Sequence, residues 1–570
     1  FYLGIPMRTY PDGKIRAVPG FDGHEGTVAG PETEIVDMLE GDGSIYHFDN
    51  SVGTQVKRTQ LTGKFEFEPG DGWKISNTTR YDDTHTQRNG VYPNTLQSAS
   101  SFLTQNAGLL AQAPGATALQ LRYVNAPTGV YDTANQNGNG LIIIGGLRGL
   151  TLPVKEFKSD TRLAHQFAMG SMTHDVTLGY YFAHIDETFG RYSSVALLDV
   201  QDNARLLDLV AVDAAGNVVK TLTDNGIYRY GYEWENAHGE QTSNAVYLSD
   251  EWQVTPKFRI DGGVRYEWMH TQGTVGLKQT VNLGDPNTIA DDQVITGSGQ
   301  FANYDVTFQH ATWTIGANYQ FTHNAGVFAR YTSANRMPSL GNFVTSAGAT
   351  PIIQTMQLGE VGLKYSSPLI DAYATGFWTK YNNVGFTNTV FNLNGTTTSQ
   401  QLYADTQTFG VELEGSLHPV EWFDLSWTAT LEDPEYKGLV YTDNANLQHD
   451  FDGNRLIRVP TVSLRIVPGL NLLGDRLRVQ ASWEYEGARY VDTANSVRLP
   501  AYATVNVSVR AQVTDQLSIY GYVDNVNNSL GLTEGNPRAG EVQNADAGAN
   551  TFIARPILGR NFRAAIMYKF

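Results

Sequence analysis

The stretch Lys257-Phe-Arg-Ile-Asp-Gly-Gly-Val-Arg-Tyr-Glu-Trp-Met-His270 alternates between two kinds of side chain. Its even positions up to Trp268 hold apolar or aromatic groups and one glycine. Its odd positions carry charges of both signs, on Arg259, Asp261, Arg265 and Glu267. Because successive side chains of a strand point to opposite faces, this period of two predicts a β-strand with one charged face and one apolar face.

The same alternation recurs along most of the chain, for example at 312–321, 477–486 and 504–513. Read together, these segments predict about seventeen strands. We expect the strands near 56–68, 73–84, 156–168, 173–186, 242–254, 257–270, 306–321, 325–333, 354–366, 369–384, 402–417, 421–433, 457–467, 474–487, 500–513, 516–526 and 558–570.

The connections between these strands are alternately short and long. Tight turns such as Pro69–Gly72 and Thr322–Asn324 alternate with long polar stretches. A soluble sandwich also has alternating strands, but long loops after nearly every hairpin would be unusual in it. Short turns at one end and long loops at the other are typical of a bacterial outer-membrane protein. The sequence therefore predicts an all-β fold, a transmembrane antiparallel β-barrel embedded in outer-membrane lipid and lipopolysaccharide.

The composition agrees with this fold class and excludes several functions. No apolar run approaches the roughly 20 residues of a membrane-spanning helix, and a mean hydropathy of −0.31 suits strands of which only alternate residues face lipid. A net charge of −18 argues against a nucleic acid partner. The chain has no cysteine, which excludes disulfides and thiolate chemistry.

The odd number of strands bears on domain organisation, because bacterial barrels close with an even number. The order of turns makes 56–68 run toward the periplasm, so residues 1–55 are expected to form an extracellular loop. We expect this loop to follow N-terminal strands that lie upstream of the chain. Residues 56–570 are then the barrel itself, with long extracellular loops.

The last ten residues, Asn561-Phe-Arg-Ala-Ala-Ile-Met-Tyr-Lys-Phe570, form another alternating segment. Its apolar face ends on an aromatic carboxy-terminal residue. This arrangement resembles the assembly signal of barrels inserted into the outer membrane, and we assign that role to Phe562, Ile566, Tyr568 and Phe570.

Several motifs together resemble TonB-dependent transporters, whose barrels have 22 strands and enclose a plug. The segment 499–528 is similar to the family's penultimate hairpin, with its Val-Asp-Asn-hydrophobic-Asn ending, and Gly559-Arg560 to its closing Gly-Arg. Three further motifs follow the family's order: Leu358-Gly-Glu-Val-Gly-Leu-Lys-Tyr365, Thr408-Phe-Gly-Val-Glu-Leu-Glu414 and Ala334-Asn-Arg-Met-Pro-Ser-Leu340.

The resemblance implies a function and a set of partners. Counted back from strand 22, the segment 56–68 would be strand six, so about five strands, the plug and the TonB box would lie upstream of Phe1. The protein would import a scarce, bulky nutrient, such as a ferric siderophore or a glycan, energised by the TonB–ExbB–ExbD complex. A plug, in this protein or a separate one, and a surface lipoprotein are further expected partners. The alternative is a passive porin-type channel.

The charged faces of the strands are expected to line the lumen and, by the resemblance, to hold a plug. These residues are Arg259, Asp261, Arg265, Glu267, Arg330, Glu412, Glu414, Arg478, Glu484 and Arg510. Aromatic and amide side chains of the outer loops suit contact with a sugar or an organic chelate. The candidates for ligand binding are Tyr92, Tyr123, Tyr131, Tyr192, Tyr228, Tyr230, Asn335, Arg336 and Tyr490.

No enzyme motif stands out, so we expect neither catalysis nor a cofactor. A Gly-x-Ser-x-Gly elbow, a P-loop and a His-Glu-x-x-His helix are all absent from the sequence. Asp450, Asp452 and Asn454 have the one-three-five spacing of a calcium loop, but the twelfth position is Thr461. We therefore predict no metal site, with these three residues as the nearest candidate.

Overall fold

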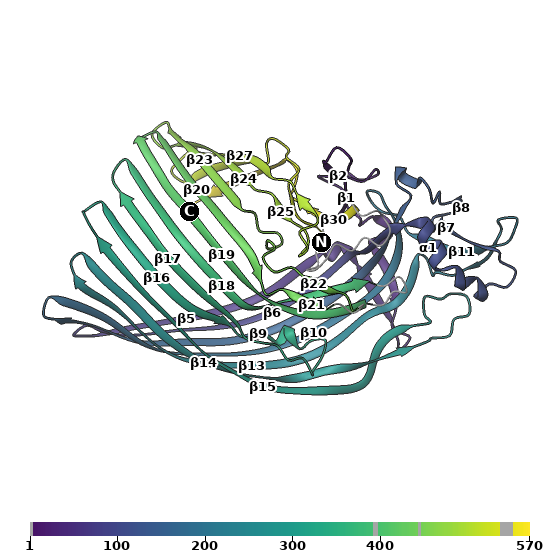
Figure 1. Ribbon diagram of the computed structural model, residues 1–570, viewed down its shortest axis with the longest axis horizontal. Coiled ribbons are helices and arrows are strands. Elements are labelled where there is room, and N and C mark those ends of the chain that lie inside the picture. The colour runs from purple at the N-terminus through teal and green to yellow at the C-terminus, as the bar shows by residue number, and fades with distance from the viewer. Residues whose placement is uncertain (1–3, 392–396, 443–445, 536–550) are drawn as a thin grey trace.

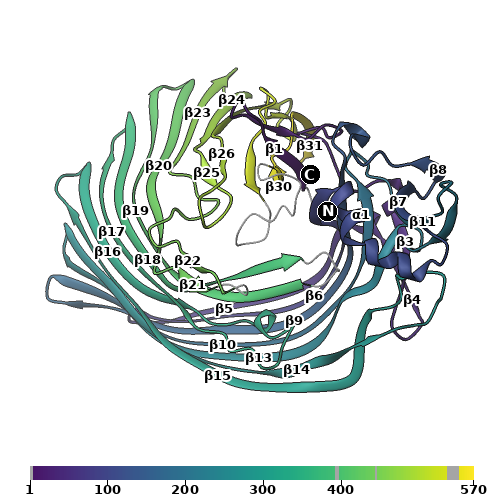
Figure 2. The same cartoon turned by 45° about the vertical axis from the view of Figure 1, so that its right-hand side comes forward.

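The computed structural model describes residues 4–391, 397–442, 446–535 and 551–570. Seventeen of its strands form one large sheet that curls into a barrel (Figures 1 and 2). They are β5 (Thr54–Gly70), β6 (Trp73–Ser98), β9 (Leu141–Met169), β10 (Met172–Asp199), β13 (Ile227–Thr255), β14 (Phe258–Val281), β15 (Val294–Gln320), β16 (Ala325–Arg336), β17 (Gln354–Ser366), β18 (Ile370–Phe391), β19 (Thr397–Val420), β20 (Phe423–Lys437), β23 (Val462–Leu472), β24 (Leu477–Glu486), β27 (Tyr502–Gln512), β28 (Leu517–Asp524) and β31 (Asn561–Tyr568).

Each of these strands pairs antiparallel with the next one along the chain, from β5 to β31. The predicted segments correspond one to one with the observed strands, and the short turns lie together at one end of the barrel. The all-β prediction and the predicted strand order are confirmed.

The apolar side chains of the strands point outward. Ile315 is 53 % exposed, and Leu178 and Ile566 are 54 % and 74 % exposed, although all three are large and apolar. Their neighbours on the opposite face are polar, as the alternation predicts. The sheet therefore has an apolar outer surface and a polar lumen, and the strands do not press two apolar faces together as in a sandwich.

The long-loop ends of several strands extend much further than predicted, among them those of β6, β9, β10 and β13. β6, β9, β10 and β13 continue to Ser98, from Leu141, to Asp199 and from Ile227, through regions expected to be loops. The run Leu141-Ile-Ile-Ile144 is buried on both faces, so its sequence does not alternate. A strand covered on both sides reads as a continuous apolar run, which explains the difference.

The buried core of the molecule lies at this long-loop end. One cluster packs a four-stranded sheet and α1 (Ala99–Gln105) against the inward side chains of the extended strands, including Ile142 and Leu197. The sheet has the order β12 (Val218–Thr221), β11 (Leu207–Val212), β7 (Ala118–Tyr123) and β8 (Ala126–Val130).

A second cluster covers the outward side of the same strands. It includes residues of the hairpin β3 (Ile35–Leu39) and β4 (Ile45–Asp49), packed around Ile143 and Leu198. Gly149 of β9 is required here, because a Cβ at this position would lie 1.9 Å from the Tyr46 hydroxyl. The extended strands therefore form the middle layer of a compact body. We call this layer, together with α1, the sheet β12-β11-β7-β8 and the hairpin β3–β4, the long-loop body.

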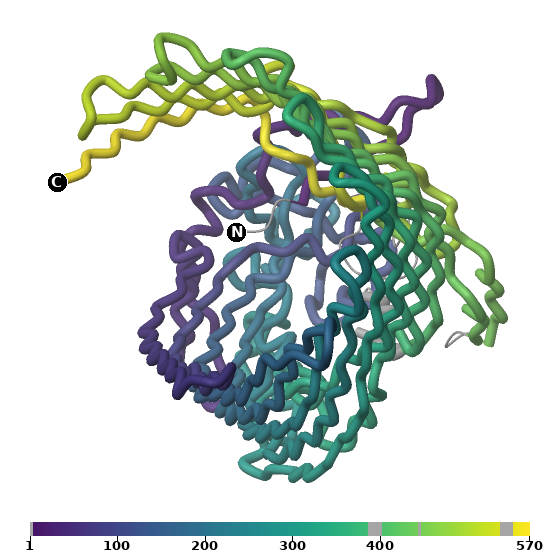
Figure 3. The backbone as a smooth tube through the Cα atoms, turned by 90° about the vertical axis from the view of Figure 1, so that its left-hand side faces the viewer, coloured from purple at the N-terminus to yellow at the C-terminus, as the bar shows by residue number. Residues whose placement is uncertain are grey.

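The strand order places β31 next to β5. With an odd number of strands these two run parallel, unlike every other neighbouring pair. No residue register joins them among the described residues, and nearly all their side chains are exposed. Figure 3 shows their short-turn ends well separated.

At the long-loop end, a small sheet connects the two chain ends. β1 (Ile5–Thr9) pairs antiparallel with β30 (Thr551–Pro556), with β2 (Ile15–Ala17) and β29 (Leu532–Gly535) on either side. Residues at the two ends of the sequence, such as Met7 and Phe552, share one buried cluster. No helix in the described part of the chain has the length and hydrophobicity to cross a membrane.

Candidate functional site

The lumen wall carries a ladder of ion pairs. On β14, the Arg265 guanidinium lies 3.1 Å from Glu267 and 5.0 Å from the ring of Tyr181. Asp261 accepts a hydrogen bond of 2.7 Å from Arg330 of β16. Arg259 of β14 lies 3.2 Å from Glu251 of β13. These predicted lumen residues come from β14 and from β16, which lies two strands away, and they meet because their positions share the inward parity.

The ladder continues on the opposite wall, where Arg478 makes two parallel hydrogen bonds of 2.8 and 2.9 Å to Asp424. Glu484 lies 3.2 Å from Arg465. Glu414 and Arg465 line one hollow of about 410 Å³. Glu412 lies opposite Thr375 and Thr430, and Arg510 opposite Arg478 and Tyr520. Whether any of these ten residues contacts a plug stays a prediction.

A further inward cluster lies on β5, β6 and β9. The Asp82 carboxylate is buried between Arg58, at 2.6 Å, and Arg80, at 2.5 Å, and Arg80 also reaches Glu156. Asp83 and His85, its near neighbours in sequence, are exposed and have the outward parity. Asp83 and His85 therefore lie on the opposite side of β6 from the Asp82 carboxylate.

A short segment of chain lies against the inner wall. Residues 337–353, between β16 and β17, pack on the inward side chains of β10, β13, β14 and β15. Phe343 is fully buried and stacks on Tyr304 with the ring centroids 4.4 Å apart. Gly239 and Gly273 leave room for this tyrosine, because a Cβ at either would lie within 2.5 Å of its hydroxyl. We call residues 337–353 the inner-wall segment.

Five of the predicted ligand-binding tyrosines are buried inside the long-loop body. Their hydroxyl groups donate hydrogen bonds within the protein: Tyr123 to Asp199, Tyr131 to the Leu141 carbonyl, Tyr192 to the Leu39 carbonyl, Tyr228 to Asn106 and Tyr230 to Asp224. In this conformation they serve packing, and they share no open surface. Burial raises the pKa of both Tyr123 and Tyr131, and the Asp199 carboxylate reinforces the effect.

The other four predicted residues retain some exposure but lie in different places. Asn335 and Arg336 end β16, where they pair with Thr355 and Gln354 of β17. Tyr490 belongs to the two-residue strand β25 (Arg489–Tyr490), next to β26 (Arg498–Leu499). Tyr92 lies on β6, within the charged cluster described next. Ligand contact by any of the nine stays a prediction.

A charged cluster that sequence reasoning missed surrounds Tyr92. The guanidinium carbons of Arg148 and Arg88 lie 4.7 and 5.7 Å from its ring centroid. Arg148 also pairs with Glu233 at 2.6 Å. The network continues through Arg191, Glu235 and Lys278, with Arg191 to Glu235 at 2.5 Å and Lys278 to Glu235 at 3.0 Å. These residues lie in the unpredicted extensions of the strands, where no alternation indicated which face they occupy.

The long-loop body contains an open cavity of about 580 Å³. Amide groups dominate its lining, together with Tyr228 and the buried Arg229, whose Nε donates a hydrogen bond of 3.0 Å to the Gln293 carbonyl. The lining residues are Gln105, Asn106, Gly108, Leu109, Gln112, Tyr228, Arg229, Ile289, Asp292 and Gln293. This volume falls within the range of small-molecule sites.

The three residues that came nearest to a calcium loop in the sequence, Asp450, Asp452 and Asn454, take part in turn contacts. The Asp452 carboxylate accepts a hydrogen bond from the Gly438 amide, and Asp450 accepts one from the Asp452 amide. The Asn454 side chain donates to the Thr493 carbonyl. Elsewhere in the described chain, Asp186, His238 and Glu240 are grouped closely enough to hold a metal ion, although Asp186 is more than 50 residues away from the other two in the sequence.

Comparison with known proteins defines the class to which this fold belongs. The family model "TonB dependent receptor-like, beta-barrel" matches residues 23–526. The chain therefore belongs to the TonB-dependent receptor family and is an integral protein of the bacterial outer membrane. In such barrels the short turns are generally periplasmic and the long loops extracellular.

Individual receptors match this chain only at low sequence identity. The catecholate siderophore receptor Fiu of Escherichia coli K12 is 24 % identical over 357 residues, which are 60 % of this chain and 39 % of Fiu. The pesticin receptor of Yersinia pestis is 27 % identical over 295 residues, 50 % of this chain and 38 % of that receptor.

Among solved structures, the siderophore receptor PiuA from Acinetobacter baumannii superposes with a TM-score of 0.61 at 16 % identity. The match covers 91 % of this chain and 65 % of PiuA. A closed form of Escherichia coli Fiu gives a TM-score of 0.57. The chain thus spans less than two thirds of the length of these relatives, and the structural likeness establishes the fold.

Proposed function

We propose that this chain is the wall of a TonB-dependent importer for a ferric siderophore or a similarly bulky organic ligand. The observation that carries the proposal is the family match over 23–526. The siderophore receptors named above point to the class of ligand. A lumen lined with both charges suits a plug held by ion pairs and hydrogen bonds.

We further propose that the complete receptor has about five more strands between β31 and β5. A plug would occupy the lumen of that complete barrel. The odd strand count supports this arrangement, as do the parallel orientation and the exposed side chains of these two strands. Coupling to TonB–ExbB–ExbD would then depend on a segment outside residues 1–570.

The ligand would enter through the long-loop body. Tyr92 with Arg88 and Arg148 offers an aromatic face beside cations on the inner wall, and such a site can bind an aromatic, anionic chelate. Asn335, Arg336 and Tyr490 are additional contact candidates. The buried tyrosines would instead maintain the shape of the body.

Uptake of a radiolabelled ferric catecholate tests the function, in cells whose own receptors for it are deleted and which express the complete receptor. We expect saturable uptake that disappears when TonB is inactivated. Uptake that is linear in concentration and independent of TonB would support the porin-type alternative instead.

The ligand contact is tested by ligand binding to Tyr92→Ala, with Tyr180→Ala as the matched control. Tyr180 is a 44 % exposed tyrosine on the lipid-facing side of β10. We expect about tenfold weaker binding for the first variant and no change for the second. Equal affinities would exclude Tyr92 from the ligand site.

A further inference from the structure

A band of polar side chains crosses the outer surface just beyond the apolar belt. Asp186 of β10 lies directly opposite Glu240 of β13, which lies opposite Gln272 of β14, which lies opposite Asp305 of β15. These positions have the same parity as the lipid-facing Leu178 and Tyr180 of β10 and Val246 and Leu248 of β13. The band therefore faces the membrane side of the wall.

The height of this band follows from strand geometry. About ten residues separate His174, near the periplasmic turn, from His184, the first polar outward residue beyond Tyr180 and Phe182. At about 3.4 Å per residue and a tilt near 40°, they span about 25 Å, which is the height of the apolar belt of such barrels. Asp186 and Glu240 thus lie at the headgroups of the outer leaflet.

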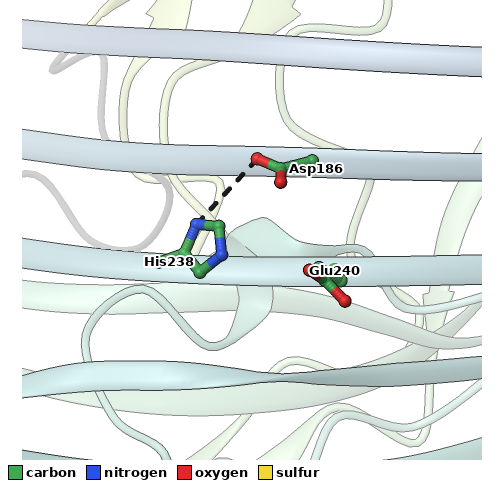
Figure 4. Close-up of side chains that lie close together, drawn as sticks. All are labelled: Asp186, His238 and Glu240. Carbon is green, nitrogen blue, oxygen red and sulfur yellow. Dashed lines mark ion pairs between the residues drawn. The ribbon is translucent and has the colours of Figure 1, made fainter.

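Within the band, three side chains converge (Figure 4). Ligand atoms of Asp186, His238 and Glu240 all lie within 4.8 Å of one another. His238 Nδ1 is 3.9 Å from Asp186 Oδ1 and 3.2 Å from the Thr188 hydroxyl. The Gln272 amide donates a hydrogen bond of 3.1 Å to Glu240 Oε2. His238 and Glu240 lie two residues apart on β13 and therefore share one face. Asp186 joins them from the neighbouring strand β10.

Two carboxylates directly opposite each other on a sheet repel. Among the described residues, neither Asp186 nor Glu240 forms an ion pair with lysine or arginine, although Lys155 lies opposite Asp186 on its other side. A bound cation would remove the repulsion.

We infer that Asp186, His238 and Glu240 form a site for a divalent metal ion, which joins the barrel to phosphate groups of the outer leaflet. One imidazole and two carboxylates are a ligand set of the kind that zinc takes, at about 2.0–2.2 Å per bond. The side chains of Asp186 and His238 are about 43–45 % exposed, so they have room to rotate toward a shared ion. The remaining coordination positions face outward, where phosphate oxygens are available.

Metal binding is tested with zinc ion alone, added to the metal-free complete receptor in detergent, without a polyhistidine tag, by titration calorimetry. We expect one site that weakens at least about tenfold in His238→Ala and in Glu240→Gln. His47→Ala is the matched control, because His47 forms an exposed pair of 2.6 Å with Asp37 and belongs to no group of three possible ligands within the described part of the chain. Retention of the site in His238→Ala, or its loss in His47→Ala, would overturn the assignment.

The link to the membrane is tested by binding of purified lipopolysaccharide to the same proteins. Zinc should strengthen binding several-fold for the unsubstituted receptor and leave His238→Ala unchanged. Dephosphorylated lipopolysaccharide should show no zinc effect with either protein. An equal zinc effect on both proteins, or on the dephosphorylated form, would refute the phosphate link. Thermal unfolding without metal confirms that each variant folds.

Discussion

At the scale of single residues, the tyrosines of the long-loop body show how burial changes a role. Their positions in polar, aromatic loops suggested contact with a ligand. In the structure Tyr131 is 2 % exposed, and its hydroxyl satisfies the backbone carbonyl of Leu141 at 2.7 Å. A buried carbonyl without a partner costs about 1–3 kcal/mol, so this side chain stabilises the body.

Tyr131 also makes the stability of the body depend on pH. Burial raises its pKa above the value near 10 of the unfolded chain. Its contribution is therefore fully present below pH 10 and is lost as the pH rises above 10, by about 1.4 kcal/mol per unit until the folded form also ionises. Tyr131→Phe should be less stable than the parent at pH 8 and should lose less stability between pH 10 and 11.

Limited proteolysis of the long-loop body across this pH range measures the effect. Tyr10→Phe provides the control, since Tyr10 lies in the turn after β1 with a long hydroxyl contact of 3.4 Å. A parent protein whose protease resistance is the same at pH 9 and pH 11 would contradict the prediction.

At the scale of elements, the inner-wall segment occupies part of the lumen without any regular strand of its own. The segment is fixed by Leu340 and Phe343, which enter the apolar patch around Met269 and Tyr304, and by the hydrogen bond from Gln241 to the Pro338 carbonyl. A few side chains therefore decide whether 337–353 lies on the wall or extends from it.

Phe343→Ala should release this segment. The variant loses a fully buried ring and its stacking on Tyr304, a loss of about 3–4 kcal/mol in local stability. We expect new protease cleavage between 337 and 353, identified by mass spectrometry, while the barrel stays intact. Phe301→Ala, which removes a 52 % exposed ring, should cleave like the parent. An unchanged pattern in Phe343→Ala would show that other contacts hold the segment.

At the scale of the whole molecule, stability and assembly depend on different parts. The wall is held by one continuous antiparallel ladder, and the buried clusters lie mainly in the long-loop body. The carboxy-terminal Phe570 contributes little to the ladder or to the buried clusters. Its side chain is fully exposed and packs edge to face on Tyr568.

Removal of Phe570 should therefore lower the amount of receptor in the outer membrane several-fold without changing the unfolding temperature of the assembled fraction. Phe570→Tyr keeps an aromatic terminus and should assemble normally. Heat-modifiable migration in gels quantifies assembly, and differential scanning calorimetry measures unfolding. Normal membrane levels after the deletion would refute the role of this residue as an assembly signal.

The sequence by itself determined the wall of the barrel. Strands such as 257–270 face lipid on one side and water on the other, and this difference imposes a period of two that can be read directly. It also indicated which face of these strands is charged, and on that face Arg265 pairs with Glu267 and Arg478 with Asp424.

Only the tertiary structure decided the long-loop body. There the strands are covered on both faces, the alternation disappears, and residues distant in sequence, such as Tyr123 and Asp199 or Ile5 and Ala554, are brought together. The convergence of Asp186 with His238 and Glu240 is of the same kind, because it depends on the register of two strands whose connecting loop is long. Register is set by pairing across the sheet, and a single strand's sequence does not encode it.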